Sequence, residues 1–266
     1  MKDACDCHVH VFGPPERFPF SADRKYTPPQ ASVEALLALQ EKLGLERVVI
    51  VQASPYGTDN RCMLDALERL GNRARGVAVI DQDTSLIPMH GRGVRGVRVN
   101  LQTGGERDPE VARRLIEQAA RRVAPLGWHL QLWTNAPMLA ALHDYLAALP
   151  VPLVIDHFGL AASLAAAAPL LSLVRGGNTW VKLSAPHRVG GAVDDVAAAL
   201  IAARPDRLVW GTDWPHPGMG PRKPEKVQPF DEIDDAAALE RLHCWAGSAA
   251  LARTILVDNP ARLYDF

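Results

Sequence analysis

Short runs of apolar and β-branched residues recur along the chain, and polar loops or helix-like segments separate them. Such runs, about four to eight residues long, are typical of buried strands in parallel sheets. Eight runs fit this description, at 4–10, 47–52, 75–80, 94–100, 128–133, 152–157, 179–184 and 207–213. Eight strands that alternate with helices predict an α/β fold of the (β/α)₈ type, a TIM barrel.

Apolar positions between these runs repeat at helical spacing. The pattern predicts helices over 31–43, 59–70, 108–124, 137–148, 161–175 and 192–203. Ser32 is placed to cap the first helix. The connection over 81–93 contains Pro88 and predicts at most a short helix, so we expect a barrel that is distorted there. The tail over 236–266 predicts a final helix and a segment that packs on the barrel.

Length and composition narrow the class of protein. A chain of 266 residues suits one barrel, so we predict a single domain over 1–266. The net charge of −1 and the scattered basic residues argue against nucleic acid as a partner. We expect no membrane span and no secretory leader, and therefore a cytoplasmic protein. The four cysteines are expected as packed thiols, and the sequence leaves the oligomeric state open.

Two histidines stand at the end of the first predicted strand. Residues two apart in a strand point to the same side, so His8 and His10 should project together, with Asp6 one step deeper. The same alternation turns Cys5 and Cys7 toward the helices, which argues against a mixed Cys/His metal site. An H-x-H pattern alone is a weak signal of function.

The ends of two later strands strengthen that signal. The sixth strand ends at Asp156 and His157, and the eighth ends at Asp213. Taken singly, His157 could be a structural histidine and Asp213 a helix cap. The carboxyl ends of barrel strands meet at one rim, however, so we expect His8, His157 and Asp213 to converge in one site.

Longer stretches identify a family. The segments DCHVH, DHFG, GTDWPHP and LVDNPARLYDF resemble the amidohydrolase superfamily, in the branch that contains 2-pyrone-4,6-dicarboxylate lactonase, and the likeness spans nearly the whole chain. Members of this branch act on lactones, including one that isomerises a sugar lactone. The resemblance implies that Asp213 activates water, while His8, His10 and His157 polarise the carbonyl and stabilise the oxyanion.

Arginines suggest an acidic substrate. Arg98 shares a strand face with Gly96 and Asn100, so it can point into the pocket and pair with a carboxylate. The resemblance adds Arg188 as a second carboxylate-binding residue. It also implies that Ser54 and Tyr26 make polar contacts with the substrate. For each of these residues a structural role is the alternative.

The resemblance favours a site without a metal cofactor. Zinc-dependent members combine the H-x-H pair and the last aspartate with a histidine on the fifth strand. Here the fifth strand carries only His129, at its N-terminal end, and His157 falls on the sixth. If one predicted strand were wrong, His8, His10, His157 and Asp213 could instead hold one divalent metal such as zinc.

Departures from the family pattern leave the substrate open. Gly104 stands where the dicarboxylate lactonase has a further arginine, and Trp133 replaces a tyrosine. Arg107 lies nearby, but the sequence does not show where it points. We therefore predict a hydrolase of a small carboxylated lactone. The alternatives are a sugar-lactone isomerase, a zinc-dependent amidohydrolase or decarboxylase, and a protein that only binds small acids.

Overall fold

Eight parallel strands form one sheet in chain order. The computed structural model describes residues 1–218, 220 and 223–266. The strands are β1 Cys5–Val9, β2 Arg47–Val51, β3 Ala74–Ala78, β4 Val94–Asn100, β5 His129–Trp133, β6 Leu153–Ile155, β7 Thr179–Ser184 and β8 Leu208–Gly211. Each lies in a predicted run or begins one residue before it, so the (β/α)₈ prediction is confirmed.

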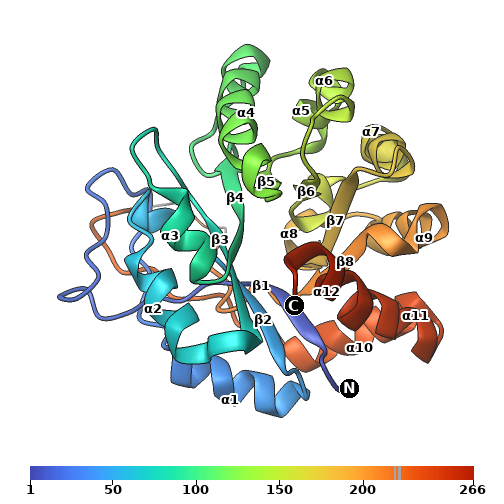
Figure 1. The fold of residues 1–266 in the computed structure, drawn as a ribbon. Coiled ribbons are helices and arrows are strands. Elements are labelled where there is room, and N and C mark those ends of the chain that lie inside the picture. Colours follow the sequence, from blue (N-terminus) through green and yellow to red (C-terminus); the bar gives the residue numbers. More distant parts are fainter. Residues whose placement is uncertain (219, 221–222) are drawn as a thin grey trace.

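Helices surround the strands (Figure 1). They are α1 Val33–Leu43, α2 Arg61–Leu70, α3 Leu86–Gly91, α4 Pro109–Val123, α5 Ala136–Ala141, α6 His143–Ala147, α7 Leu164–Arg175, α8 Pro186–Val189, α9 Val193–Ala203, α10 Asp235–Ala246, α11 Ala249–Arg253 and α12 Asn259–Tyr264. Ser32 caps α1 as predicted, accepting a hydrogen bond from the backbone of Ala35. Only the short α3 joins β3 to β4, which confirms the expected irregularity.

Two predicted helices are divided in the structure. The helix expected over 137–148 is divided into α5 and α6, because Leu142 leaves the helical region with φ −104° and ψ 9°. The tail is not one helix but α10, α11 and α12, with a π-helical segment at Thr254–Asp258 before α12. The tail packs on the barrel, as expected.

A β-bulge in β1 overturns one prediction about side-chain direction. Asp6 pairs with Val48 but Val9 pairs with Ile50, so β1 has an extra residue there. Cys5 and Cys7 consequently join an inner apolar cluster drawn from six strands and the C-terminal tail. Asp6 turns the other way and accepts hydrogen bonds from the backbone and hydroxyl of Thr212, at 3.0 and 2.6 Å.

Asp6 also bridges the seam where β1 meets β8. The segment that follows β8 is joined to β1 there by a bridge between Val9 and Trp214 and by the Asp213 N–H, which donates to the His8 carbonyl at 2.9 Å. Burial raises the pKa of Asp6 to about 7, although the bonds from Thr212 oppose that shift. The seam therefore fixes His8 and Asp213 side by side through the backbone.

The tail closes the N-terminal end of the barrel. Tyr264 is buried in the inner cluster, and in Figure 1 the C-terminus lies near the middle of the ring of strands. Arg75 donates from Nε to the carbonyls of Tyr264 and Asp265, at 3.2 and 3.0 Å. This end is thus filled by side chains, and the opposite rim is left for a site.

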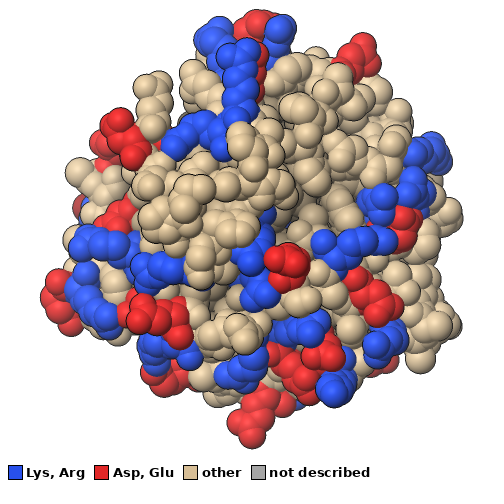
Figure 2. All heavy atoms as spheres, viewed as in Figure 1, with Lys and Arg blue, Asp and Glu red and all other residues tan. Residues whose placement is uncertain are grey.

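The surface matches the sequence in two respects. Figure 2 shows basic and acidic side chains interspersed on the visible face. Among the helices that the structure describes, none has the length and apolar character to cross a bilayer. All four cysteines are free thiols; three are buried as expected, but Cys244 is exposed and does not pack in the core.

Candidate active site

The predicted polar residues meet at the C-terminal rim of the barrel. Asp213, just beyond β8, lies at the centre. Its Oδ1 is 3.6 Å from His8 Nε2, 3.7 Å from His10 Nε2 and 3.5 Å from His157 Nε2. All four side chains are nearly inaccessible to solvent. One small molecule could therefore contact the whole cluster, as the sequence predicted.

Strained backbone at two strand ends aims these side chains. His157 and Asp213 have φ of 48° and 70°, in the left-handed region that residues other than glycine rarely adopt. Each such residue costs on the order of 1 kcal/mol or more, which the surrounding structure must compensate. Each lies two residues beyond the end of its strand, β6 or β8, and these strand ends meet at the same rim. The two residues with strained backbone are therefore those whose side chains turn toward the centre of the site.

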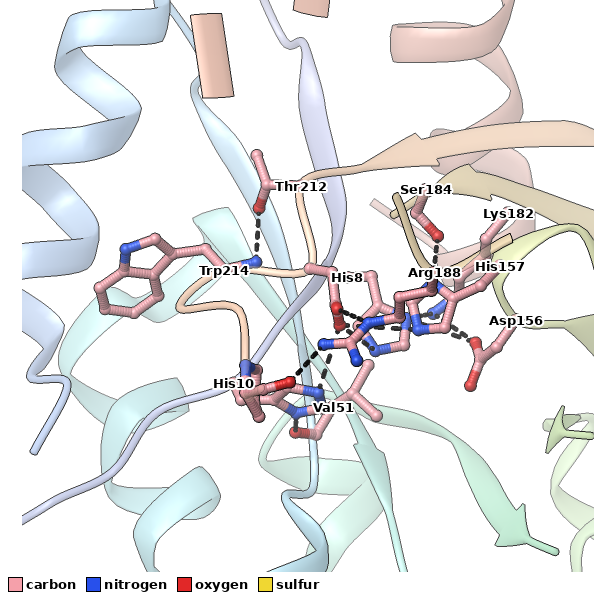
Figure 3. A network of polar contacts seen from close by, with 12 residues as sticks. His8, His10, Val51, Asp156, His157, Lys182, Ser184, Arg188, Thr212 and Trp214 are labelled. Carbon is pink, nitrogen blue, oxygen red and sulfur yellow. Dashed lines mark hydrogen bonds and ion pairs between the residues drawn. The ribbon is translucent and has the colours of Figure 1, made fainter. Parts of the chain in front are cut away.

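Hydrogen bonds fix the ring of His10. Its Nδ1 lies 2.8 Å from the Val51 carbonyl, which can only accept, so the Nδ1 proton points there (Figure 3). The unprotonated Nε2 consequently faces Asp213. His157 is tied through Nδ1 to the Ser184 hydroxyl at 2.7 Å, a partner that can donate or accept. Burial lowers the pKa of His10 and of His157 to about 4, so both rings are neutral at pH 7.

Arg188 holds the other oxygen of Asp213. Its Nε donates to Asp213 Oδ2 at 2.6 Å, and its Nη2 donates to the Pro217 carbonyl at 2.7 Å. Burial opposes ionisation of Asp213, but the Arg188 guanidinium and the imidazoles outweigh it and hold the pKa of this carboxyl well below its usual range. Asp213 is therefore an ionised but strongly stabilised carboxylate in this state.

A small cavity opens beside the cluster. Its volume is about 30 Å³, far below the roughly 300–1,000 Å³ of a typical ligand pocket. Its walls include all four predicted substrate-binding residues, Tyr26, Ser54, Arg98 and Arg188. A lactone needs more room than this cavity gives, so we expect side chains to move as it enters, and Arg188 is the wall residue that also covers Asp213.

The remaining sequence questions concern the loop after β4. Thr103 lines the cavity, and Asn100 donates to its hydroxyl at 3.0 Å. Neither Gly104 nor Arg107 is among the described residues that form the wall, and Arg107 is exposed. In this structure, therefore, Arg107 does not line the cavity.

Sequence reasoning missed a charged layer beneath the rings. Lys182, on β7, is fully buried and donates from Nζ to Gln131 Oε1 at 2.8 Å. Asp156 accepts from Arg98 Nε at 3.0 Å and lies 3.7 Å from Lys182 Nζ. Burial lowers the pKa of Lys182 to about 8, so it remains protonated at pH 7. The available signal was a lysine inside the apolar strand TWVKLS.

The donor set could also hold a divalent metal. One ligand atom from each of His8, His10 and Asp213 lies within 4.8 Å of the others. The His10 Nε2 lone pair faces a carboxylate oxygen, an arrangement that a cation between them would stabilise. His129 lies at the start of β5 against Tyr264, so the fifth strand brings no histidine to the rim. No candidate group among the described residues includes a cysteine.

A (β/α)₈ barrel with histidines and an aspartate at its C-terminal rim defines an amidohydrolase-type fold and site. The chain belongs to the amidohydrolase family, whose model matches residues 5–266. A 2-pyrone-4,6-dicarboxylate hydrolase from Comamonas testosteroni is 37% identical, over 98% of this chain and 90% of the relative. A 4-sulfomuconolactone hydrolase from Rhizobium radiobacter is 38% identical, over 99% of this chain and 90% of the relative.

A solved structure has the same architecture. It is a probable 2-pyrone-4,6-dicarboxylic acid hydrolase from Acinetobacter baumannii with citric acid bound. It is 26% identical to this chain, has a TM-score of 0.82, and covers 99% of this chain and 100% of its own.

Proposed function

We propose that this chain hydrolyses a small carboxylated lactone, with Asp213 as the general base. The observation that carries the proposal is the position of Asp213 Oδ1, 3.5 to 3.7 Å from the Nε2 atoms of three histidines. A carboxylate beside imidazoles supplies both the base and the polar groups that acyl transfer needs. The two curated relatives are named as hydrolases of a pyrone dicarboxylate and of a sulfomuconolactone.

The proposed reaction begins with water in the small cavity. Asp213 Oδ1 takes one proton while the water oxygen attacks the lactone carbonyl carbon, and the C=O π bond becomes a C–O⁻ single bond. His10 Nε2 accepts a hydrogen bond from the same water, because its proton is on Nδ1. The oxyanion re-forms the carbonyl, the ring C–O bond breaks, and Asp213 returns the proton to the leaving oxygen.

Arg188 links substrate binding to this step. In the structure it pairs with Asp213, and its charge lowers the pKa of that carboxyl. A substrate carboxylate competes for the same guanidinium and draws it away from Oδ2. Asp213 then loses a cationic neighbour and becomes a stronger base. Arg98, fixed by Asp156 at 3.0 Å, provides a second cation at the cavity wall.

We propose that the reaction needs no metal. The buried cations Arg98, Lys182 and Arg188 already surround the cluster and can stabilise negative charge there. A divalent ion held by His8, His10 and Asp213 would polarise the carbonyl and lower the pKa of water. Chelation separates the two cases, because only the metal-dependent reaction is lost with the metal.

The direct test is acid release from a panel of lactones. The panel contains pyrone carboxylates, muconolactones and sugar lactones, with and without a carboxylate, and a pH indicator follows opening before and after treatment with a chelator. We expect acid release from carboxylated members, unchanged by chelation. Interconversion of lactones without acid would support the isomerase alternative. Binding without turnover of any member would contradict the proposal.

A further inference from the structure

The histidine at the centre of the site has an unusual pair of neighbours. His8 Nδ1 lies 3.3 Å from Lys182 Nζ and 3.3 Å from Asp156 Oδ1 (Figure 3). An ammonium group can only donate a hydrogen bond, and an ionised carboxylate can only accept one. The two neighbours therefore require opposite positions for the ring proton. Lys182 requires a bare Nδ1, and Asp156 requires a protonated one.

The geometry favours Lys182. Both contacts are 3.3 Å long, but only the one with Lys182 meets the geometric requirements of a hydrogen bond to His8 Nδ1, which leaves Asp156 Oδ1 without a well-formed bond among the described residues. The charge of Asp156 is already balanced by Arg98, which donates to Oδ2 at 3.0 Å, and Gln131 donates to the same oxygen at 3.1 Å. A proton on His8 Nδ1 would point toward a buried cation without a well-formed acceptor, and that arrangement is costly.

Resting on the proposed function, we propose that Lys182 is a positioning residue that fixes the neutral His8 ring with its proton on Nε2. The Nε2 atom is buried, has no hydrogen-bond partner among the described residues, and faces Asp213 Oδ1 at 3.6 Å. Its N–H is then available to the lactone carbonyl oxygen. The adjacent His10 has the opposite tautomer, because Val51 holds its Nδ1 proton.

The two histidines of the H-x-H pair therefore have different roles. His10 presents a lone pair, which can accept from the attacking water, and His8 presents a donor for the oxyanion. A metal ion needs a lone pair on every coordinating nitrogen. Lys182 therefore opposes metal binding through His8 Nε2, although the spacing of the side chains would allow it. The buried lysine thus selects between two chemistries that the same rim residues could support.

Nitrogen-15 NMR of the ring nitrogens tests the tautomer directly. In the wild-type protein at pH 7 without metal, we expect His8 to show a protonated Nε2 and a bare Nδ1, with the signals assigned by their loss in His8→Gln. This measurement needs neither substrate nor a buried-lysine variant. A protonated Nδ1 in the wild-type protein would overturn the proposal, even if lactone hydrolysis is confirmed. Conversely, the expected tautomer without lactonase activity would contradict only the proposed function.

Lys182→Met tests the consequence for metal and catalysis. Methionine keeps an unbranched side chain, one atom shorter than that of lysine, and removes the donor, so His8 becomes free to place its proton on Nδ1. We expect zinc affinity, measured by titration calorimetry on protein that circular dichroism shows to be folded, to rise at least about tenfold. The kcat should fall by about 10², the cost of one oxyanion donor, with KM little changed.

The control is Lys42→Met, because Lys42 is exposed on α1. It should leave zinc affinity and kcat unchanged. Unchanged zinc affinity in folded Lys182→Met would contradict the proposal, as would a loss expressed only in KM. If Lys182→Met does not fold, the wild-type NMR result remains decisive.

Discussion

The two ends of the barrel use arginine for different purposes. At the N-terminal end, Arg75 donates to the tail carbonyls of Tyr264 and Asp265 and lies 4.6 Å over the ring of Phe266. At the C-terminal rim, Arg188 pairs at 2.6 Å with a buried carboxylate beside a cavity. The Arg75 guanidinium stabilises a fixed tail, whereas the Arg188 guanidinium can exchange Asp213 for a substrate carboxylate.

Buried polar atoms without partners do not by themselves distinguish the two ends. His8 Nε2 at the rim and the Tyr264 hydroxyl at the base both lack a hydrogen bond among the described residues. The difference lies in what surrounds them. His8 faces an opposed carboxylate near a cavity, and Tyr264 is packed among cysteine, valine and tryptophan side chains. A buried polar group without a partner therefore indicates function where it faces both a charged group and a cavity.

The largest expected effect comes from the aspartate at the rim. Asp213→Asn should lower kcat for lactone opening by about 10³ or more, because the amide cannot take a proton from water. The matched change at the base is Asp265→Asn, whose side chain is 79% exposed, and it should leave kcat unchanged. Steady-state acid release measures both. Retention of more than a tenth of wild-type kcat in Asp213→Asn would exclude it as the base.

The arginine pair should separate activity from stability. Arg188→Met removes a buried charge partner and should lower kcat/KM for a carboxylated lactone by about 10². The loss should be smaller for a lactone without a carboxylate. Arg75→Met should leave kcat/KM unchanged for both lactones. It should lower the free energy of unfolding by about 1–2 kcal/mol, measured by urea denaturation. Equal losses for both lactones would mean that Arg188 does not recognise the carboxylate.

The sequence could predict the strands and the rim residues because both depend on local patterns. Short runs of apolar and β-branched residues located β1 and β8, and the topology of a barrel then brought His8 and Asp213 together. The bulge in β1 was not predictable in this way. It arises from pairing with β2 and β8, which alternation within one strand does not encode, so the directions of Cys5 and Asp6 were wrong.

The layer under the rings was missed for a related reason. Lys182 is 174 residues from its partner His8, and 51 from Gln131, so no spacing rule links them. A charged residue in an apolar strand showed that some partner must exist, because a buried ammonium is costly alone. Only the assembled barrel identifies Asp156 and Gln131 as those partners. The tautomer of His8 therefore depends on tertiary structure.

The pH dependence of activity should report the buried rings. The pKa values of His10 and His157 are lowered to about 4, so both are neutral above that pH and charged below it. Protonated His10 can no longer accept from water and pairs with Asp213 instead. We expect kcat/KM to be about tenfold lower at pH 3 than at pH 6, where rates are compared only in folded protein. A midpoint near 6.5, the ordinary imidazole value, would contradict this.

Stability should fall over a different pH range from activity. The unfolded chain binds protons at its histidines with pKa near 6.5, whereas His10 and His157 in the folded protein bind them only near 4. As the pH falls from 6.5 to 4, the unfolded state gains more protons, so the free energy of unfolding decreases. Thermal unfolding followed by circular dichroism across this range provides the control for the rate measurements.

The smallest expected effect concerns the unpartnered hydroxyl at the base. Tyr264 is fully buried, and its oxygen has no hydrogen-bond partner among the described residues. Removing a buried polar group that makes no hydrogen bond relieves its desolvation cost. Tyr264→Phe should therefore leave kcat unchanged and alter the free energy of unfolding by no more than about 1 kcal/mol, in the stabilising direction. A clear loss of stability in urea denaturation would mean that the hydroxyl binds an internal water or polar atom. In that case, the two ends of the barrel would differ only in their charged groups, and not in the hydrogen bonding of their buried polar atoms.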